Sequence, residues 1–251
     1  MHMTRIILIT TLLFVALTTQ AQQTEGVVNY TRKTYWANVS SRLTYLSQEQ
    51  KDRIKNTYKN FNEYKEKMKL TFSPSASLYG YESDVSESDD GRWSWRNKAL
   101  FFYRDFDKER VIDVEELLGK TYSVEDSLIL PKWKIGNKVR EIAGHMCLNA
   151  TTSDPVKNQQ ITAWFAQDIP VAAGPERYCG LPGLILELDI NDGDVIIEAN
   201  SIEFKPVADV LKPAKPKKPK KLDEKGYQTL IGSYIADQVK AQQNPYWELR
   251  Y

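Results

Sequence analysis

The sequence predicts a mainly β protein, an α+β chain whose one curved antiparallel sheet is accompanied by an early helix and a C-terminal helix. Short runs of alternating apolar and polar residues recur through residues 26–204. Aromatic residues are frequent, with 14 Tyr and 6 Trp, and such side chains favour strands. Turn-forming residues separate many of the runs. A parallel α/β core is therefore disfavoured.

The first part of the chain predicts a strand, a helix and a hairpin. The strand is expected at residues 26–36. Ser47, followed by Gln50 three residues later, is typical of a capping box. Apolar residues at helical spacing then predict a helix over residues 48–67.

A series of further strands is expected up to residue 204. The segments with strand-like patterning are residues 68–72, 77–81, 99–106, 109–117, 120–123, 140–151, 160–167, 184–190 and 195–204. Between the last two, Asp192-Gly193 is a strong hairpin signal. The acidic, serine-rich residues 82–91 do not match a calcium-binding loop, so a solvated loop is expected there.

The N-terminus is typical of a cleaved secretion signal. Arg5 precedes an apolar stretch over residues 6–17, and Thr19-Gln20-Ala21 offers small residues for a signal peptidase. We expect residues 1–21 to be removed before Gln22. The apolar stretch is shorter than the ~20 residues of a membrane span. A periplasmic protein with no membrane span after cleavage is therefore expected.

The C-terminal part divides into a spacer and a tail. Residues 22–204 are expected to form the β-rich domain. Residues 205–221 alternate lysine with proline, which predicts an extended, semi-rigid spacer. Residues 222–251 carry an apolar helix face and then an aromatic end. Such apolar surface is expected to fold back onto the sheet or to dock onto a partner.

Charge and cysteine content narrow the classes of partner. The chain has 34 basic and 33 acidic residues, and loss of Arg5 balances them. A balanced chain gives no reason to expect nucleic acid as a partner. Both cysteines, Cys147 and Cys179, follow the cleavage site, and an even pair in the periplasm predicts a disulfide. Two independent buried thiols are the alternative.

One segment resembles a known family. Gly180-Leu181-Pro182-Gly183-Leu184-Ile185 is similar to the signature of the GLPGLI family, secreted proteins of Gram-negative envelopes with no assigned biochemical role. Residues 142–150 and 163–170 resemble two motifs that precede this signature, and Gly174-Pro175 resembles the Gly-Pro after them. The resemblance implies an envelope location. By analogy of fold alone, the sheet is expected to be similar to the half-barrel of lipoprotein carriers.

The signature loop has a structural explanation. Pro175 and Pro182 fix φ, while Gly174, Gly180 and Gly183 can adopt conformations that other residues avoid. We therefore expect the loop to deliver Leu184 and Ile185 into the sheet at one register. A binding role for the same loop is the alternative.

Motifs of catalysis are sparse. After cleavage the single histidine is His145, and the sequence lacks a Gly-x-Ser-x-Gly elbow, a His-x-x-x-His pair, a P-loop and a dinucleotide fingerprint. If residues 140–151 form one strand, His145 and Cys147 share a face and could bind copper or zinc. A buried histidine without metal is favoured, because a zinc site needs about four ligands.

The sequence thus favours a non-enzymatic binding or accessory protein of the cell envelope, with no catalytic residues and no cofactor. Its partner is expected to be a hydrophobic or peptide-like ligand or another envelope protein. Metal handling through His145 and Cys147 is the first alternative, and an unrecognised hydrolase is the second. An open apolar concave face would support the favoured interpretation.

Overall fold

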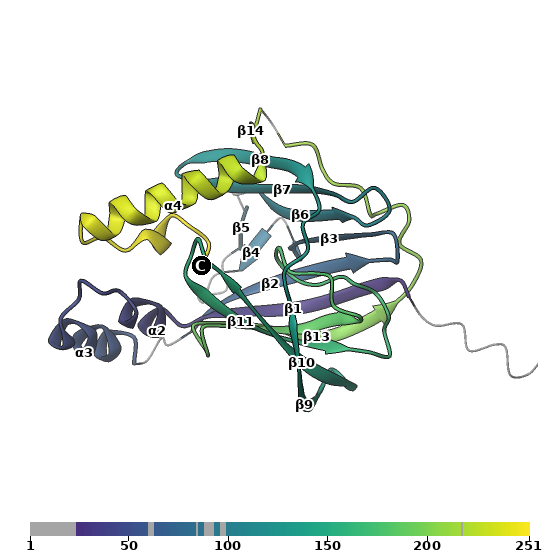
Figure 1. Cartoon of the computed structure of the whole chain (residues 1–251), viewed down its shortest axis with the longest axis horizontal. Helices are drawn as coiled ribbons and strands as arrows, with labels where there is room; N and C mark the ends of the chain where they lie inside the picture. The colour runs from purple at the N-terminus through teal and green to yellow at the C-terminus, as the bar shows by residue number, and fades with distance from the viewer. Residues whose placement is uncertain (1–23, 60–62, 84, 88–92, 96–98, 217) are drawn as a thin grey trace, which may run out of the picture.

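The computed structural model describes residues 24–251 except 60–62, 84, 88–92, 96–98 and 217 (Figure 1). Its elements, in chain order, are β1 (Gly26–Thr34), α2 (Trp36–Ser41), α3 (Gln48–Thr57), β2 (Tyr64–Phe72), β3 (Ala76–Tyr81), β4 (Val85–Glu87), β5 (Trp93–Trp95), β6 (Leu100–Asp105), β7 (Arg110–Leu117), β8 (Lys120–Ser127), β9 (Lys134–Ile142), β10 (His145–Asp154), β11 (Gln159–Ala166), β12 (Leu184–Ile190), β13 (Val195–Phe204), β14 (Lys220–Leu222), α4 (Glu224–Lys240) and the 3₁₀ helix η1 (Pro245–Trp247). The expected signal peptide lies outside the described residues, as does part of the acidic segment 82–91.

Twelve of the described strands form one open sheet, in the order β14-β8-β7-β6-β3-β2-β1-β13-β12-β11-β10-β9. Neighbouring strands pair antiparallel, except that the short β14 runs parallel to β8. The sheet curves strongly, and α4 lies alongside its open side (Figure 1). This helix packs with Tyr122 and Val124 of β8 and with Val156 in the β10–β11 turn, near opposite ends of the strand order. The predicted mainly β class, with early and C-terminal helices, is confirmed.

The inward face of the sheet is covered by the chain itself. Along β1, alternate residues such as Val28 and Tyr30 are buried, as the period of two requires. The loop between β11 and β12 packs into the same apolar core through Ile169, Val171 and Leu181, each 1–2% exposed. The Tyr30 hydroxyl donates to the main-chain oxygen of Ile185 at 2.6 Å, which ties the loop to the sheet. The concave face is therefore filled, and the open apolar surface that would have supported the favoured interpretation is not seen there.

The early helical region is shorter and more divided than predicted. The capping box at Ser47 and Gln50 is present. However, α3 ends at Thr57, and the short α2 precedes it. Residues 64–67 belong to β2, where Glu66 and Met68 point inward with Leu70. The helical spacing of Tyr64 and Met68 was misleading, because two residues four positions apart also lie on the same face of a strand.

The strand predicted over residues 140–151 is interrupted by a hairpin. Ala143 and Gly144 have φ values of 50° and 84°, and Ile142 pairs with His145 across them. Positive φ at both central residues is the geometry of a tight two-residue hairpin turn. Alanine at the first position concealed this turn, because Asn, Asp or Gly is the usual residue there.

The hairpins expected at 68–81 and 184–204 are confirmed. Phe72 pairs with Ser77 in the first hairpin. In the second, Ile190 pairs with Val195, and Asp192 and Gly193 have φ of 58° and 96°. The second hairpin continues directly from the signature loop, so it fixes where that loop enters the sheet.

The lysine- and proline-rich segment is not a free tether. Val207 and Leu211, 2% and 8% exposed, pack with Ala76 and with outward-facing side chains of β1, β3 and β6. Residues 220–222 then extend the sheet as β14. The segment thus leads from β13, in the interior of the strand order, across the outer face to β14 at the end beside β8. The tail therefore folds back onto the sheet, which is one of the two alternatives expected from the sequence.

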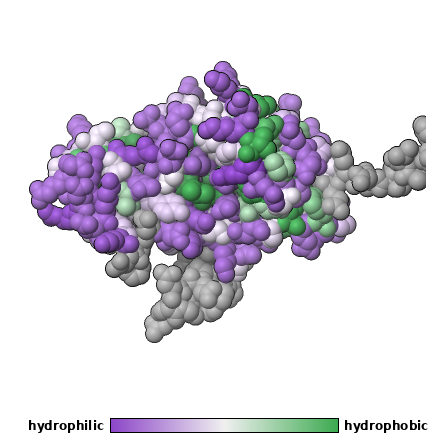
Figure 2. Space-filling model, turned by 90° about the horizontal axis from the view of Figure 1, so that it is seen from below, coloured by the Kyte–Doolittle hydropathy of each residue, from purple (hydrophilic) through white to green (hydrophobic). Residues whose placement is uncertain are grey.

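No helix among the described residues is long and apolar enough to cross a membrane. The face of the molecule in Figure 2 is largely hydrophilic, with only small hydrophobic patches between polar side chains. Concave sites are therefore better candidates for a function than this broad surface.

Candidate functional site

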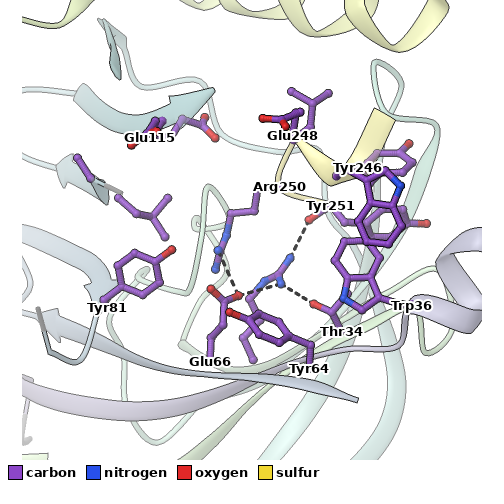
Figure 3. A pocket seen from close by; sticks show the side chains of 16 residues that line it. Thr34, Trp36, Tyr64, Glu66, Tyr81, Glu115, Tyr246, Glu248, Arg250 and Tyr251 are labelled. Carbon is purple, nitrogen blue, oxygen red and sulfur yellow. Dashed lines mark hydrogen bonds and ion pairs between the residues drawn. The ribbon is translucent and has the colours of Figure 1, made fainter. Parts of the chain in front are cut away.

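A pocket of about 430 Å³ lies where the first strands of the sheet meet the end of the tail (Figure 3). We call it the aromatic pocket. It is lined by Arg32, Thr34, Trp36, Tyr64, Glu66, Tyr81, Ala99, Leu100, Glu115, Glu116, Tyr246, Trp247, Glu248, Leu249, Arg250 and Tyr251. Its volume falls within the range of about 300–1,000 Å³ typical of ligand sites.

The floor is a closed ring of four charged side chains, which we call the ion-pair ring: Arg32 of β1, Glu66 of β2, Arg250 of the tail and Glu176 of the loop. Glu66 Oε2 lies 3.1 Å from Arg32 Nη1 and 3.4 Å from Arg250 Nη1. Glu176 Oε1 lies 3.3 Å from Arg32 Nε and 2.8 Å from Arg250 Nη2. Each charged side chain thus has two neighbours of opposite charge, and buried charges need such partners.

Further contacts hold the ring in one geometry. Arg32 donates to Thr34 Oγ1 at 2.6 Å and to the main-chain oxygen of Tyr251 at 3.1 Å. Glu176 has φ of 57°, an unusual value for a residue other than glycine. Burial raises the pKa of the Glu176 carboxyl, but Arg250 and Arg32 outweigh it, so the net shift of this pKa is downward. Glu176 is accordingly an anion at neutral pH.

Aromatic side chains form the walls above this floor. The rings of Trp36 and Trp247 stack with centroids 5.0 Å apart and an interplanar angle of 24°. Trp247 is 58% exposed and Tyr64 is 53% exposed, so both present surface to solvent. Tyr246 and Tyr251 pack edge to face at 4.5 Å behind the tryptophan pair. The stack joins α2 to η1, and both of its tryptophans line the pocket; Figure 3 shows Trp36 on one side of it.

A second buried charge cluster adjoins the ring and centres on Arg177. Its guanidinium lies 3.3 Å from Asp113 and 2.9 Å from Glu224, and 3.9 Å above the ring of Tyr227. It therefore joins β7 to α4. Because Glu176 and Arg177 are consecutive, one loop supplies an anion to the ion-pair ring and a cation to the adjoining charge cluster.

A larger pocket of about 700 Å³ lies beside α4, and we call it the helix groove. Its apolar lining includes Ile129, Leu130, Val156, Tyr227 and Ile231. Ile129 is 73% exposed and Leu130 is 51% exposed, so part of this apolar surface faces solvent.

The signature residues support the aromatic pocket from below and do not line it. Gly174 and Pro175 precede Glu176, and Gly180 has φ of +89°, as its predicted role allows. Leu181 is buried in the core, and Pro182 leads through Gly183 into β12, where Leu184 and Ile185 are fully buried. The predicted positioning of Leu184 is seen in its pairing with Ala166.

Gly183 is required for close approach and not for positive φ. Its φ is not in the left-handed region, but a Cβ there would lie 2.8 Å from the carbonyl carbon of Ala166. We expect Gly183→Val to destabilise by about 1–3 kcal/mol, the usual cost of overpacking. Thermal melts would measure this. Gly232→Ala is the matched control, since a Cβ there meets only Val156 at 3.8 Å and should stabilise α4 by about 0.5–1 kcal/mol. An unchanged melt for Gly183→Val would contradict the steric explanation.

The structure does not join the two cysteines of the expected disulfide: Cys147 and Cys179 are both free buried thiols. Cys147 Sγ donates to the main-chain oxygen of His145 at 3.5 Å, whereas Cys179 lies beside Arg104. Burial raises the pKa of Cys147 to about 11 and also raises that of Cys179. An even cysteine count carries no information on the positions of the sulfurs.

Thiol titration tests this difference. We expect two reactive thiols per chain once the unreduced protein is denatured, and slow reaction in the native state because both sulfurs are buried. Cys179→Ser should retain one thiol. Zero thiols in the denatured wild type would restore the disulfide inferred from the cysteine count.

His145 has a carboxylate partner. As the first residue of β10 it places Nδ1 2.6 Å from Asp168 Oδ2, and its ring packs on Phe204 at 6.5 Å. The described residues contain no group of three or more His, Cys, Asp or Glu side chains arranged to hold a metal.

The comparisons with known proteins bear on the segment that includes the loop. A family model described as a protein of unknown function (Porph_ging) matches residues 156–187. This match starts in the β10–β11 turn and ends in β12. Glu176 and Arg177 lie within it. No curated protein matches the chain.

Solved structures of PNGF-II share the fold. The structure in the C2 space group is 15% identical and superposes with a TM-score of 0.53, covering 82% of this chain. The structure in the P2₁ space group, also 15% identical, gives 0.54 and covers 83%. The alignments cover 32% and 33% of the PNGF-II chains, so this chain spans about a third of their length.

The ion-pair ring was missed from the sequence, although a signal for half of it exists. Arg32 follows Val28 and Tyr30 on the inward face of β1, and Glu66 precedes Met68 on the inward face of β2. A charge at a core position of a strand requires a partner. Nothing in the spacing indicates Glu176 or Arg250, because they come from distant parts of the chain.

Proposed function

We propose that this chain is a non-enzymatic binding or accessory protein of a Gram-negative cell envelope, and that its aromatic pocket holds part of a peptide-like ligand or of a partner protein. The apolar residues 6–17 and the cleavage pattern before Gln22 support a periplasmic location. The similarity of residues 180–185 to the GLPGLI signature, inside the segment matched by the family model, supports the same assignment.

The observation that carries this proposal is the combination of a fixed floor and exposed aromatic walls. The ion-pair ring gives the floor one geometry before any ligand arrives, which lowers the entropic cost of binding. Trp247 and Tyr64 remain about half exposed above it. Tryptophan, tyrosine and arginine are the residues that dominate binding energy in protein recognition sites.

A lipid-like ligand on the concave face has less support. Ile169, Val171 and Leu181 already occupy that face. The helix groove is the second candidate site, because Ile129 and Leu130 give it exposed apolar surface. A hydrophobic ligand would bind there and not in the aromatic pocket.

The two chemical alternatives have weaker support. Metal handling lacks a ligand set, because the described residues contain no group of three or more His, Cys, Asp or Glu side chains arranged to hold a metal. A hydrolase would need a nucleophile at His145, whose described contacts are the carboxylate of Asp168 and the ring of Phe204. Neither contact supplies a nucleophilic hydroxyl group.

An array of immobilised decapeptides of random composition, probed with residues 22–251, tests the proposal. We expect a subset of peptides to bind. Trp247→Ala should weaken their binding, because the indole stack is lost. Ile129→Ala, in the helix groove, is the reciprocal control and should leave binding unchanged. Binding abolished by Ile129→Ala but retained by Trp247→Ala would move the function to the helix groove. No binding to any peptide would reject the proposal.

A further inference from the structure

We infer that the aromatic pocket selects a cationic side chain, lysine or arginine, in its peptide-like ligand; this inference rests on the proposed function. Six charged residues line the pocket in the part of the chain that the structure describes. Four are acidic and two are basic: Glu66, Glu115, Glu116 and Glu248 against Arg32 and Arg250. The lining therefore carries two formal negative charges in excess.

Both basic residues of the lining are already paired. Arg32 and Arg250 each lie between Glu66 and Glu176 in the ion-pair ring. An anionic ligand would have to compete with these buried carboxylates, which would leave charges unpaired at a cost of several kcal/mol. The floor is thus closed to anions, and the acidic residues above it determine the charge preference.

Glu115 supplies the independent observation. Its side chain is buried, with 4% exposure of the residue, and its Oε1 has no hydrogen-bond partner among the described residues. The Arg177 guanidinium lies 3.7 Å from this oxygen, beyond hydrogen-bonding distance. A buried acceptor without a donor is costly. Glu115 also lines the pocket, so an ammonium or guanidinium group there would lie close to a buried carboxylate that lacks a hydrogen bond at Oε1.

The aromatic walls suit the same group. A cation placed over the face of tryptophan or tyrosine is attracted by the ring quadrupole. Trp247 and Tyr64 each leave more than half of their surface exposed beside the pocket. Figure 3 shows Trp36 and Tyr81 on opposite sides of the ion-pair ring, Tyr64 beside Glu66, and Glu115 and Glu248 above the ion-pair ring. A lysine stem would contact the rings while its charge meets the carboxylates.

Four acetylated and amidated pentapeptides, Gly-Ala-X-Ala-Gly with X as lysine, arginine, norleucine or glutamate, test the inference by calorimetric titration. The lysine and arginine peptides should bind at least about tenfold more tightly than the norleucine peptide. Their affinity should fall as salt is added, whereas that of the norleucine peptide should not. The glutamate peptide should be the weakest.

Variants identify the groups responsible. Glu248→Gln changes an exposed residue. It should lower the affinity for the lysine peptide several-fold and leave the affinity for the norleucine peptide unchanged. Glu115→Gln should do the same, with circular dichroism to verify folding. Glu49→Gln, on α3 with a side chain 84% exposed, is the matched control.

The outcomes distinguish a failure of the charge preference from a failure of the proposed peptide binding. Equal affinity for lysine and norleucine, or no effect of either glutamate variant, would overturn the charge preference while the proposed peptide binding stands. Failure of all four peptides to bind, together with an empty decapeptide array, would overturn both.

Discussion

Replacing Glu176 with glutamine is expected to destabilise the protein by about 3–5 kcal/mol, because it leaves Arg32 and Arg250 buried with one carboxylate between them. For a domain of this size the melting temperature should fall by roughly 6–20 °C. The substitution keeps the size of the side chain and removes only its charge. Thermal unfolding followed by circular dichroism measures the effect.

The matched control is Glu203→Gln. Glu203 also pairs with a cation, Lys205, at 2.6 Å, but its side chain is 66% exposed. A pair at the surface contributes about 0–1 kcal/mol. Equal effects of the two substitutions would show that the ion-pair ring contributes no more than a surface contact.

The pH dependence of Glu176 has a definite sign. Burial, the largest influence, raises its pKa, but the two arginines reverse that shift and lower the pKa in the folded state below the ordinary value. Its contribution is therefore present above the unfolded pKa of about 4.3 and is lost as pH falls through the folded pKa. The stability difference between wild type and Glu176→Gln should shrink over this acidic range. A difference that stayed constant would contradict the assignment.

Deleting residues 212–251 is expected to abolish cooperative folding. Four apolar side chains of this segment are buried: Tyr227, Ile231, Leu249 and Tyr251. Each contributes about 1.5–3 kcal/mol, so together they approach the whole stability of a typical domain, about 5–15 kcal/mol. The deletion also removes Arg250 from the ion-pair ring. We expect loss of the near-ultraviolet dichroism and strong binding of a hydrophobic dye.

A point variant tests the same contact without removing the tail. Ile231→Ala, at a residue 2% exposed, should cost about 2–5 kcal/mol. Val210→Ala, at a residue 60% exposed, should change stability by less than about 0.5 kcal/mol. A truncated protein that kept the wild-type melting temperature would mean that the tail is only loosely attached.

Local patterns predicted much of the fold because hairpins are encoded locally. The turn at Asp192-Gly193 and the alternation on either side of it define β12 and β13 almost to the residue. The pattern failed where two periods fit the same residues, as at Tyr64 and Met68. It failed again where an uncommon turn residue, Ala143, divided one apparent strand into two.

The candidate site could not be predicted from local patterns because its parts are distant in sequence. Arg32 meets Tyr251 across 219 residues, and Trp36 stacks on Trp247. These contacts exist because the spacer crosses the outer face of the sheet and returns the tail to the beginning of the domain. Single residues of the tail, such as Arg250, carry no local sign of that destination.

The most direct test of the account is a nuclear magnetic resonance titration with the lysine pentapeptide, observing the indole N–H signals. We predict that the signals of Trp36 and Trp247 shift, because the peptide enters the pocket beside this stacked pair. The signal of Trp133, whose indole donates to Cys179 near the helix groove, should stay in place. Shifts confined to Trp133 would contradict the assignment of the aromatic pocket as the binding site.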